Sequence, residues 1–304
     1  MLFFLVINTR IYAQQDVQFS QYIYNTVTIN PGYTGSSGAL NVAALHRSQW
    51  VGLDGAPSTQ TLSLQSPIGL SRIGLGGSII NDVIGPVSET YFDANFAYRI
   101  PTSKKAKLSF GIKGGARLFN VDFNKLNKDN TDQVFFNDIN NQFSPSLGLG
   151  AYYYTDDFYI GLSAPNILET KHLNANEIDD ISSTSSVARE RVNFYLIAGH
   201  TFYLINDIRF KPTILGRAVS GAPVQVDVSA NFLFSEKLSV GLSYRWSAAF
   251  AALVGFQVSD TWLIGLAYDR ETTELVELNS GSFEVILKYD LFKKRYPQTL
   301  PRYF

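Results

Sequence analysis

The sequence predicts an all-β fold, a transmembrane antiparallel β-barrel of about fourteen strands, from three observations. Apolar and polar residues alternate along many segments, and a period of two is the side-chain period of a strand. The segments approach the roughly 9–11 residues that a tilted membrane-spanning strand needs. Short connections alternate with longer ones along the chain, as they do in outer-membrane barrels.

The alternation is clearest in residues 238–246. One face of this segment carries Leu, Val, Tyr and Trp, whereas the other carries Ser, Gly and Arg. In a barrel this pattern places the oily side chains against lipid and the polar ones inside. Comparable alternation occurs in residues 90–99, 224–234, 262–269 and 283–290. Residues 39–50 and 190–204 alternate less regularly.

The connections between the strand-like segments predict how the barrel is oriented. The predicted strands are 39–50, 59–67, 72–82, 87–99, 106–118, 143–154, 158–164, 190–204, 208–217, 223–234, 237–246, 249–258, 261–271 and 281–291. The even-numbered connections are all short, whereas the odd-numbered ones include the stretches 119–142, 165–189 and 272–280. Outer-membrane barrels have short periplasmic turns and longer outer loops, so this order predicts that both termini lie in the periplasm.

The composition favours a membrane barrel and excludes several other classes of protein. Charged residues make up 17% of the 304 residues, compared with roughly a quarter in soluble proteins. The net charge of −1 and the lack of a basic cluster argue against a nucleic-acid partner. No apolar run approaches the roughly 18 residues of a membrane-spanning helix. Without Cys, the chain has no disulfide, thiolate zinc site or Cys nucleophile.

The pattern divides the chain into four parts. Residues 1–13 resemble the end of an export signal, with an apolar stretch before the small residue Ala13; the alternative is a buried first strand. Residues 14–38 do not alternate, and we expect them to form an N-terminal plug or a periplasmic segment rather than a frayed terminus. Residues 39–292 are the predicted barrel, and residues 293–304 are a predicted periplasmic tail.

Signals for catalysis or cofactor binding are weak. His46 and Ser48 share a strand face and are the candidates for Ser/His lipid hydrolysis, but no Asp or Asn nearby would orient the histidine. His200 lies on an apolar face and His172 in a loop. Loop 119–142 has four Asp residues, but their spacing fits no EF-hand calcium site, and a solvated loop explains them better. These residues are Asp122, Asp129, Asp132 and Asp138.

Several charged residues fall on the faces that are expected to point into the barrel. They have mixed sign, so they could line a pore or form a closed interior held by salt bridges. The sequence leaves both possibilities open. The residues are Arg47, Asp93, Arg99, Lys113, Arg117, Asp227 and Arg245.

Motifs near both ends of the predicted barrel point to a known family. They are Gln18–Tyr22 (QFSQY), Asn30–Gly35 (NPGYTG), Arg47–Pro57 (RSQWVGLDGAP), Gly255–Gln257, Ile264–Asp269 and Asn279–Glu284. In this order the motifs closely resemble the PorP/SprF family, and the resemblance covers essentially the whole mature chain. The departures are modest: Gly32 stands where Ala is more usual, and the chain continues past the last strand to Phe304.

The resemblance implies an outer-membrane protein associated with the type IX secretion system. Its function would be the secretion or surface anchoring of an adhesin that carries a C-terminal sorting domain, as in gliding motility. The implied partners are this adhesin, the translocon, the periplasmic ring proteins and outer-membrane lipid. The alternative is an outer-membrane diffusion channel or a hydrophobic-solute transporter of the fatty-acid-transporter type. No cofactor, catalytic residue or metal ligand is expected.

Loop 119–142 is the first candidate for a partner-binding surface. It has aromatic residues among Asp and Asn, which suits an interface with apolar anchors and a polar rim. The alternative is that these aromatics pack against one another within the loop. The candidate partner-binding residues are Phe123, Phe135 and Phe136 of this loop and, nearer the N-terminus, Tyr22, Tyr24, Asn30, Pro31, Tyr33, Arg47, Trp50 and Asp54.

Overall fold

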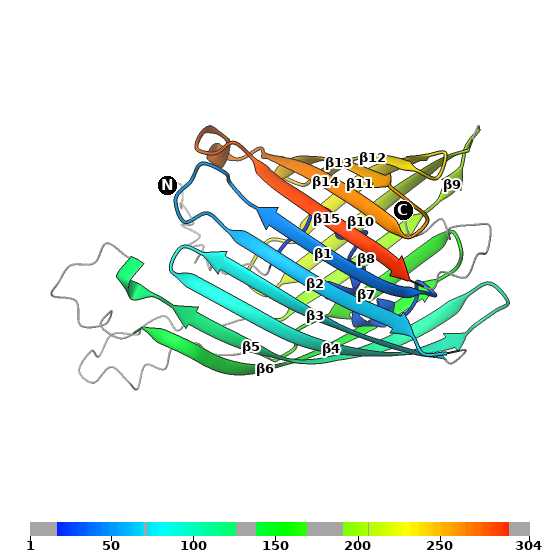
Figure 1. Cartoon of the computed structure of the whole chain (residues 1–304), viewed down its shortest axis with the longest axis horizontal. Helices are drawn as coiled ribbons and strands as arrows, with labels where there is room; N and C mark the ends of the chain where they lie inside the picture. The colour runs from blue at the N-terminus through cyan, green and yellow to red at the C-terminus, as the bar shows by residue number, and fades with distance from the viewer. Residues whose placement is uncertain (1–16, 70–71, 126–137, 169–190, 206, 292–304) are drawn as a thin grey trace, which may run out of the picture.

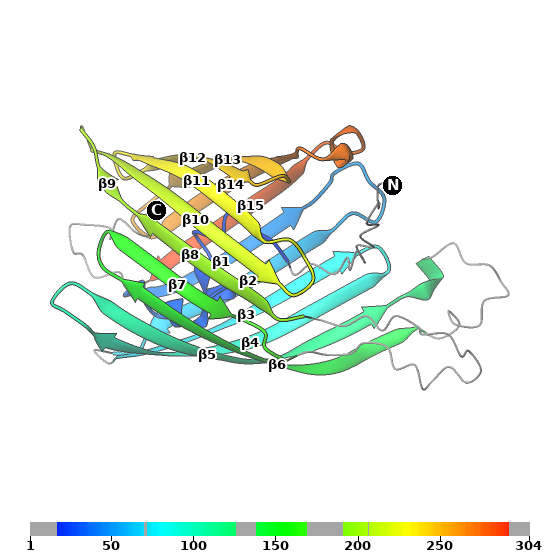
Figure 2. The same cartoon turned by 180° about the vertical axis from the view of Figure 1, so that it is seen from behind.

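The strands form one antiparallel sheet that closes on itself into a barrel. The computed structural model describes residues 17–69, 72–125, 138–168, 191–205 and 207–291. The ring is complete because β1 pairs with the last strand, β15, and β10 pairs with β11. Figure 1 shows the strands tilted around the barrel, and Figure 2 shows the same barrel from behind. In the part of the chain that the structure describes, no helix is long and apolar enough to cross a membrane.

The strands follow one another around the ring in chain order. They are β1 (Leu40–Ser48), β2 (Ser58–Pro67), β3 (Ile73–Ile84), β4 (Val87–Pro101), β5 (Lys107–Val121), β6 (Ile139–Tyr154), β7 (Phe158–Ala164), β8 (Asn193–His200), β9 (Phe202–Tyr203), β10 (Ile208–Val219), β11 (Gln225–Phe234), β12 (Leu238–Arg245), β13 (Ala249–Gln257), β14 (Trp262–Glu271) and β15 (Ser282–Leu291). β9 continues β8 in the same register along β10, so the two make one barrel strand. The predicted closed barrel of 14 strands is confirmed.

The two ends of the barrel differ in their connections. One end, which we call the long-loop end, carries the connections 49–57, 122–138, 165–192 and 272–281. The other, the short-turn end, carries the turns 68–72, 102–106, 155–157 and 235–237. β1 begins at the short-turn end and β15 ends there, because an even number of barrel strands returns the chain to the side on which the first strand began.

The inward and outward faces differ as the alternation predicts. On β12, Leu242 is 66% exposed whereas its neighbour Ser243 is 9% exposed. The exposed faces of the strands carry mostly Leu, Ile, Val and Phe, and the buried faces carry mostly Ser, Thr, Asn and charged residues. All of the charged residues expected to face the lumen are buried. The outside therefore suits hydrocarbon and the inside is polar.

Strands β5 and β6 project beyond the rest of the barrel at the long-loop end (Figure 1). They are 15 and 16 residues long. That exceeds the roughly 9–11 residues that spanning requires. The pairing of β5 with β6 shifts between Phe119 and Val121, where a bulge lies in the projecting part. The projection ends in a short 3-10 helix, η3 (Phe123–Lys125), which leads into the connection 122–138.

The hydrophobic core lies inside the barrel, around residues that precede β1. Phe19, Tyr22, Ile23, Tyr24 and Val27 are buried there against side chains of the strands. Two short 3-10 helices lie in this region, η1 (Thr26–Thr28) and η2 (Pro31–Tyr33). A barrel this wide would otherwise enclose water, so the segment supplies the interior packing that the strands lack.

Candidate functional site: the filled lumen

Residues 17–38, which we call the luminal segment, occupy the interior of the barrel. Figures 1 and 2 both show this segment, in dark blue, enclosed by the strands. Most of its side chains are buried, and they contact strands on all sides of the ring. The sequence shows no strand periodicity here, because each residue faces a different part of the wall rather than one shared face.

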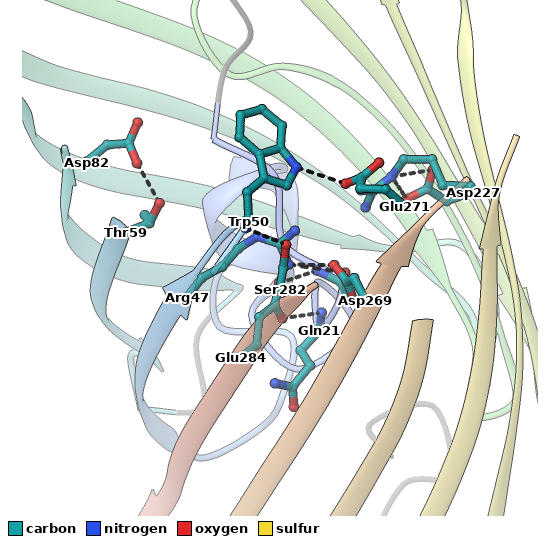
Figure 3. Close-up of polar contacts among 12 residues, drawn as sticks. Gln21, Arg47, Trp50, Thr59, Asp82, Asp227, Asp269, Glu271, Ser282 and Glu284 are labelled. Atoms are coloured by element: carbon teal, nitrogen blue, oxygen red, sulfur yellow. Dashed lines mark hydrogen bonds and ion pairs between the residues drawn. The ribbon is translucent and has the colours of Figure 1, made fainter. Parts of the chain in front are cut away.

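A cluster of buried charges binds the beginning of the luminal segment. Arg47 of β1 is ion-paired with Asp269 of β14 at 2.7 Å and with Glu284 of β15, and each of the three residues is 1% exposed. The Glu284 carboxylate also accepts the backbone N–H groups of Ser20 and Gln21 at 2.7 and 2.9 Å. The Ser20 hydroxyl donates to Asp269 at 2.6 Å. Figure 3 shows this arrangement.

The luminal segment supplies hydrogen-bond donors to the charge cluster. Buried carboxylates need both a cation and hydrogen-bond donors, because desolvation of an ion costs several kcal/mol. Arg47 supplies the charge, and the backbone of Ser20 and Gln21 supplies two further donors to Glu284. Charge-assisted hydrogen bonds of this kind are about twice as strong as neutral ones. The segment and the wall therefore stabilise each other.

Neutral hydrogen bonds hold the middle of the luminal segment to three further strands. The Tyr22 hydroxyl lies 3.0 Å from the Thr213 hydroxyl of β10, and the Tyr24 hydroxyl lies 2.8 Å from the Ser239 hydroxyl of β12. The Ser63 hydroxyl of β2 donates to the Asn25 side chain at 2.7 Å. Because these strands lie around the ring, the contacts centre the segment in the lumen.

The end of the luminal segment is bound near the short-turn end. Asn30 caps η2 by accepting the Gly32 N–H at 2.8 Å, and its amide donates to the Ala151 carbonyl of β6 at 3.1 Å. The Gly35 N–H donates to the Gln65 side chain at 2.9 Å. The Arg99 guanidinium donates to the Gly35 carbonyl. The segment then turns into β1.

Glycines in the wall allow the luminal segment to approach the strands closely. A Cβ atom on Gly111 would overlap the backbone of Pro31 and Gly32. One on Gly150 would overlap the Asn30 side chain, and one on Gly74 the Thr34 backbone. These inward-facing glycines are close-contact positions for the segment, because only a residue without a side chain leaves room for a second backbone.

Three further luminal cations are paired with carboxylates on neighbouring strands. Lys113 lies 3.1 Å from Asp93, and Arg245 lies 3.0 Å from Asp227. Arg117 lies 3.8 Å from Glu89 and stacks over the Tyr91 ring at 4.3 Å. Of the two possibilities that the sequence left open, these pairs resemble a closed, salt-bridged interior.

Small cavities remain between the luminal segment and the long-loop end. One has a volume of about 60 Å³ and borders Asp93 and Lys113. Another, of about 30 Å³, borders Asp227 and Arg245. Phe19 lines both cavities. A water molecule needs roughly 10–15 Å³ of such space, so these two cavities suit a few waters.

The structure separates the candidate partner-binding residues into two groups. The side chains of Tyr22, Tyr24, Asn30, Pro31, Tyr33 and Arg47 are buried inside the barrel. Tyr33 contacts Tyr152 edge-on, with ring centroids 5.4 Å apart. All of these residues contact the barrel's own interior. Their role in partner binding stays a prediction. Because they are buried, any such role would be indirect, through the barrel strands that they contact.

The other group lies at the long-loop end. Trp50 donates its indole N–H to Glu271 at 3.1 Å and its backbone N–H to Ser282 at 3.2 Å, which ties the connection 49–57 to the connection 272–281 (Figure 3). Asp54 is exposed in the same connection. Phe123 is half-buried in η3. Phe135 and Phe136 lie outside the described residues.

Among the residues that the structure describes, the signals for hydrolysis and for metal binding do not come together as sites. His46 Nε2 lies 3.0 Å from Ser48 Oγ, but its Nδ1 lies 3.4 Å from the amide nitrogen of Gln60. The Gln60 amide is oriented by Asn81, which donates to its oxygen at 2.9 Å, so no acceptor orients His46 as a triad requires. Asp138 accepts the Phe123 N–H at 2.9 Å, and Asp129 and Asp132 lie outside the described residues.

Sequence reasoning missed Ser20, Asp269 and Glu284 as parts of the site. Asp269 and Glu284 lie on the polar faces of their predicted strands, which placed them in the lumen. Their shared partner Arg47 was expected to face the lumen and also lies in a family motif, but it was not paired with them. What links them is the luminal segment, whose path through the barrel no periodicity reveals.

Comparison with known proteins gives a family match and several similar solved barrels. The sequence matches the family described as Type IX secretion system membrane protein PorP/SprF over residues 11–289. No curated protein matches the chain. Similar solved barrels include Omp33 of Acinetobacter baumannii, with 9% identity and a TM-score of 0.47 over 84% of this chain and 99% of that chain. A FadL homologue of Pseudomonas aeruginosa has 14% identity and a TM-score of 0.44 over 83% of this chain and 89% of its own.

These likenesses to solved structures concern the fold alone, whereas the family match spans most of the sequence, including the luminal segment and every strand but the end of β15. The ring of strands with its lipid-facing apolar surface is the fold that such a membrane protein requires. The protein therefore belongs to the PorP/SprF family of type IX secretion system membrane proteins and is an outer-membrane β-barrel.

Proposed function

We propose that the protein is a non-enzymatic receptor of the type IX secretion system, which holds a cell-surface adhesin at the outer membrane through the adhesin's C-terminal sorting domain. In this proposal the long-loop end faces outward and receives the adhesin. The short-turn end faces the periplasm, where the translocon and the periplasmic ring proteins are the partners. β15 ends on this side, so we also propose a periplasmic C-terminal tail.

The filled lumen is the observation that carries the proposal. The luminal segment occupies the interior, and the charges that could line a pore pair with one another or bind the segment. A diffusion channel needs a continuous aqueous path, and a transporter needs a cavity of the size of its solute. A barrel packed in this way favours binding at its ends over conduction through its centre.

The projecting hairpin β5–β6 supports the long-loop end as the adhesin-binding surface. Asp138 joins the two sides of the hairpin's connection by accepting the backbone N–H of Phe123 at 2.9 Å and the side-chain N–H of Asn124 at 3.3 Å. The connection 122–138 is therefore held by an ordered base that extends beyond the membrane-spanning strands. A binding loop placed on rigid strands loses less conformational entropy when a partner docks.

The proposal is tested by replacing residues 124–137 with a short Gly-Ser linker and measuring adhesin on intact cells with an antibody. We expect surface adhesin to be lost, because the proposed aromatic anchors Phe135 and Phe136 are removed while Asp122 and Asp138 keep the base of the hairpin. Barrel assembly is checked by the gel mobility of the folded protein in outer-membrane fractions.

The matched control replaces residues 220–224, an exposed connection at the same end, with Gly-Ser of equal length. Adhesin display should be normal in this control. Normal display in both variants would show that the hairpin connection does not bind the adhesin. A measurable ion conductance of the intact protein would instead favour the channel.

A further inference from the structure

The luminal segment runs from one end of the barrel to the other. Successive residues of the segment contact the wall at successive depths, and the first contacts are at the long-loop end. The Gln18 side chain donates to Gln225 at 2.7 Å, and Gln225 is the first residue of β11 after the connection 220–224. Val17 borders the same cavity as Arg217 and Arg245, which lie at the long-loop ends of β10 and β12.

The next contacts are also at the long-loop end, one step deeper. Ser20 is bound by Asp269 and Glu284. Asp269 lies two residues before the end of β14, and Glu284 lies two residues after the start of β15. Both strand ends adjoin the connection 272–281, so this contact is close to the long-loop mouth.

The last contacts of the segment are at the short-turn end. Gly35 is bound by Gln65, near the end of β2, and by Arg99, near the end of β4. Its backbone lies against Gly74, the second residue of β3. The chain then starts β1 at Leu40, at the same end. Residues 17–38 thus cross the barrel once before the first strand.

We infer that the chain enters the barrel from the long-loop side, so that the N-terminal end of the mature protein lies on the same side of the membrane as the long loops. Counting strands alone places this terminus with the short turns, because fourteen strands return the chain to its starting side. The luminal segment adds one more crossing, and the two termini of the mature chain lie on opposite sides of the membrane.

This topology makes the N-terminal end part of the outer surface. Val17 and Phe19 form the floor beneath the long loops, with Tyr195 and Ile29 beside them. The same continuous peptide reaches the short turns through Gly35. The inference concerns the path of the chain and holds whichever partner binds.

The test uses single cysteines and a membrane-impermeant maleimide, because the chain has no Cys of its own. Asp16→Cys reports the residue before the luminal segment, and Ser37→Cys reports its other end. Glu274→Cys in the connection 272–281 marks the long-loop side, and Lys104→Cys in the turn 102–106 marks the short-turn side; both positions are exposed. Each variant is labelled on intact cells, after the outer membrane is opened, and after unfolding.

We expect Asp16→Cys to react under the same condition as Glu274→Cys, and Ser37→Cys to react no earlier than Lys104→Cys. Labelling of Asp16→Cys only together with Lys104→Cys would overturn the inference. So would a thiol at position 16 that reacts only after unfolding, since the N-terminal end would then not be at the surface. Adhesin display plays no part in the readout, so the proposed receptor function and this inference can fail separately.

Discussion

Among single residues, Arg47 carries the charge on which the first luminal contacts depend. It is the cation shared by Asp269 and Glu284, and Trp50, three residues further along, joins the connections 49–57 and 272–281. A buried carboxylate without its cation is costly, whereas the same loss at the surface is screened by water. Burial therefore decides how much each ion pair contributes to the stability of the folded barrel.

We predict that Arg47→Ala lowers the free energy of unfolding by about 3–5 kcal/mol, because two buried carboxylates lose their cation. The control is Lys125→Ala, whose partner Asp122 and own side chain are 44% and 61% exposed. This control should cost less than about 1 kcal/mol. Urea unfolding in lipid, followed by Trp fluorescence and gel mobility, measures both. Equal losses in the two variants would contradict the prediction.

The sequence predicted part of this residue-level arrangement. Alternation placed Arg47, Asp269 and Glu284 on inward faces, because a strand's period of two is a local property. It could not pair them, because Arg47 and Glu284 are 237 residues apart and meet only through barrel closure. Nor could it assign the donors on Ser20 and Gln21, since backbone N–H groups carry no sequence signal.

At the scale of elements, the luminal segment and the glycines of β3, β5 and β6 form one packing unit. Glycine weakens an isolated strand, so its frequency in these strands needs a compensating contact. β5 carries one glycine that contacts the luminal segment and, three residues further along, one that does not. Gly111 faces inward against Pro31, whereas Gly114 is exposed, and a Cβ atom added there would meet no other atom within 4 Å.

We predict that Gly111→Ala destabilises the folded barrel by about 1–3 kcal/mol, because the added methyl group forces the luminal segment away from β5. Gly114→Ala, three residues along the same strand, should change stability by less than about 0.5 kcal/mol. Thermal unfolding midpoints of the two purified variants provide the measurement. If Gly114→Ala lost as much stability as Gly111→Ala, the effect would come from strand propensity and not from contact with the luminal segment.

Element boundaries show where the sequence is informative. Alternation predicted every barrel strand, including the irregular 190–204, which the structure divides at Thr201 into β8 and β9. There the Thr201 N–H donates to the Asp157 carbonyl oxygen at 2.8 Å, a contact that alternation cannot anticipate. The projecting parts of β5 and β6 were also missed, because the apolar-outward pattern does not continue there. Phe119 and Val121 of β5 are buried, and β6 carries Asn140, Asn141 and Gln142 in succession.

At the scale of the whole molecule, the barrel is a wall built around a core that comes from the same chain. Strand counting correctly predicted the number of strands in the ring. It also correctly predicted that the long loops and the short turns lie at opposite ends of the barrel. It omitted the luminal crossing, because a segment without periodicity contributes nothing to such a count. The prediction that residues 14–38 plug the barrel or lie under it rested on the lack of alternation and on the length of the segment.

We predict that removing residues 17–38, with the export signal joined to residue 39, converts the barrel into an open pore. The exposed lumen would be lined mostly by polar and charged side chains that water can solvate, beside apolar wall residues such as Tyr154, Ile197 and Ile286, so the strands should still assemble. Single-channel recording in planar bilayers should show a stable conductance that the intact protein lacks. A folded deletion variant without conductance would mean that other residues close the lumen.

The ion cluster also lies across the junction at which the ring is sealed. Its cation comes from the first strand, β1, and its carboxylates come from the last two, β14 and β15. The earliest-made residues, Ser20 and Gln21, bind those same late-made carboxylates. Closure of the ring and packing of the luminal segment are therefore one step in biogenesis. A newly exported chain must keep its N-terminal residues in place until its C-terminal strands are added.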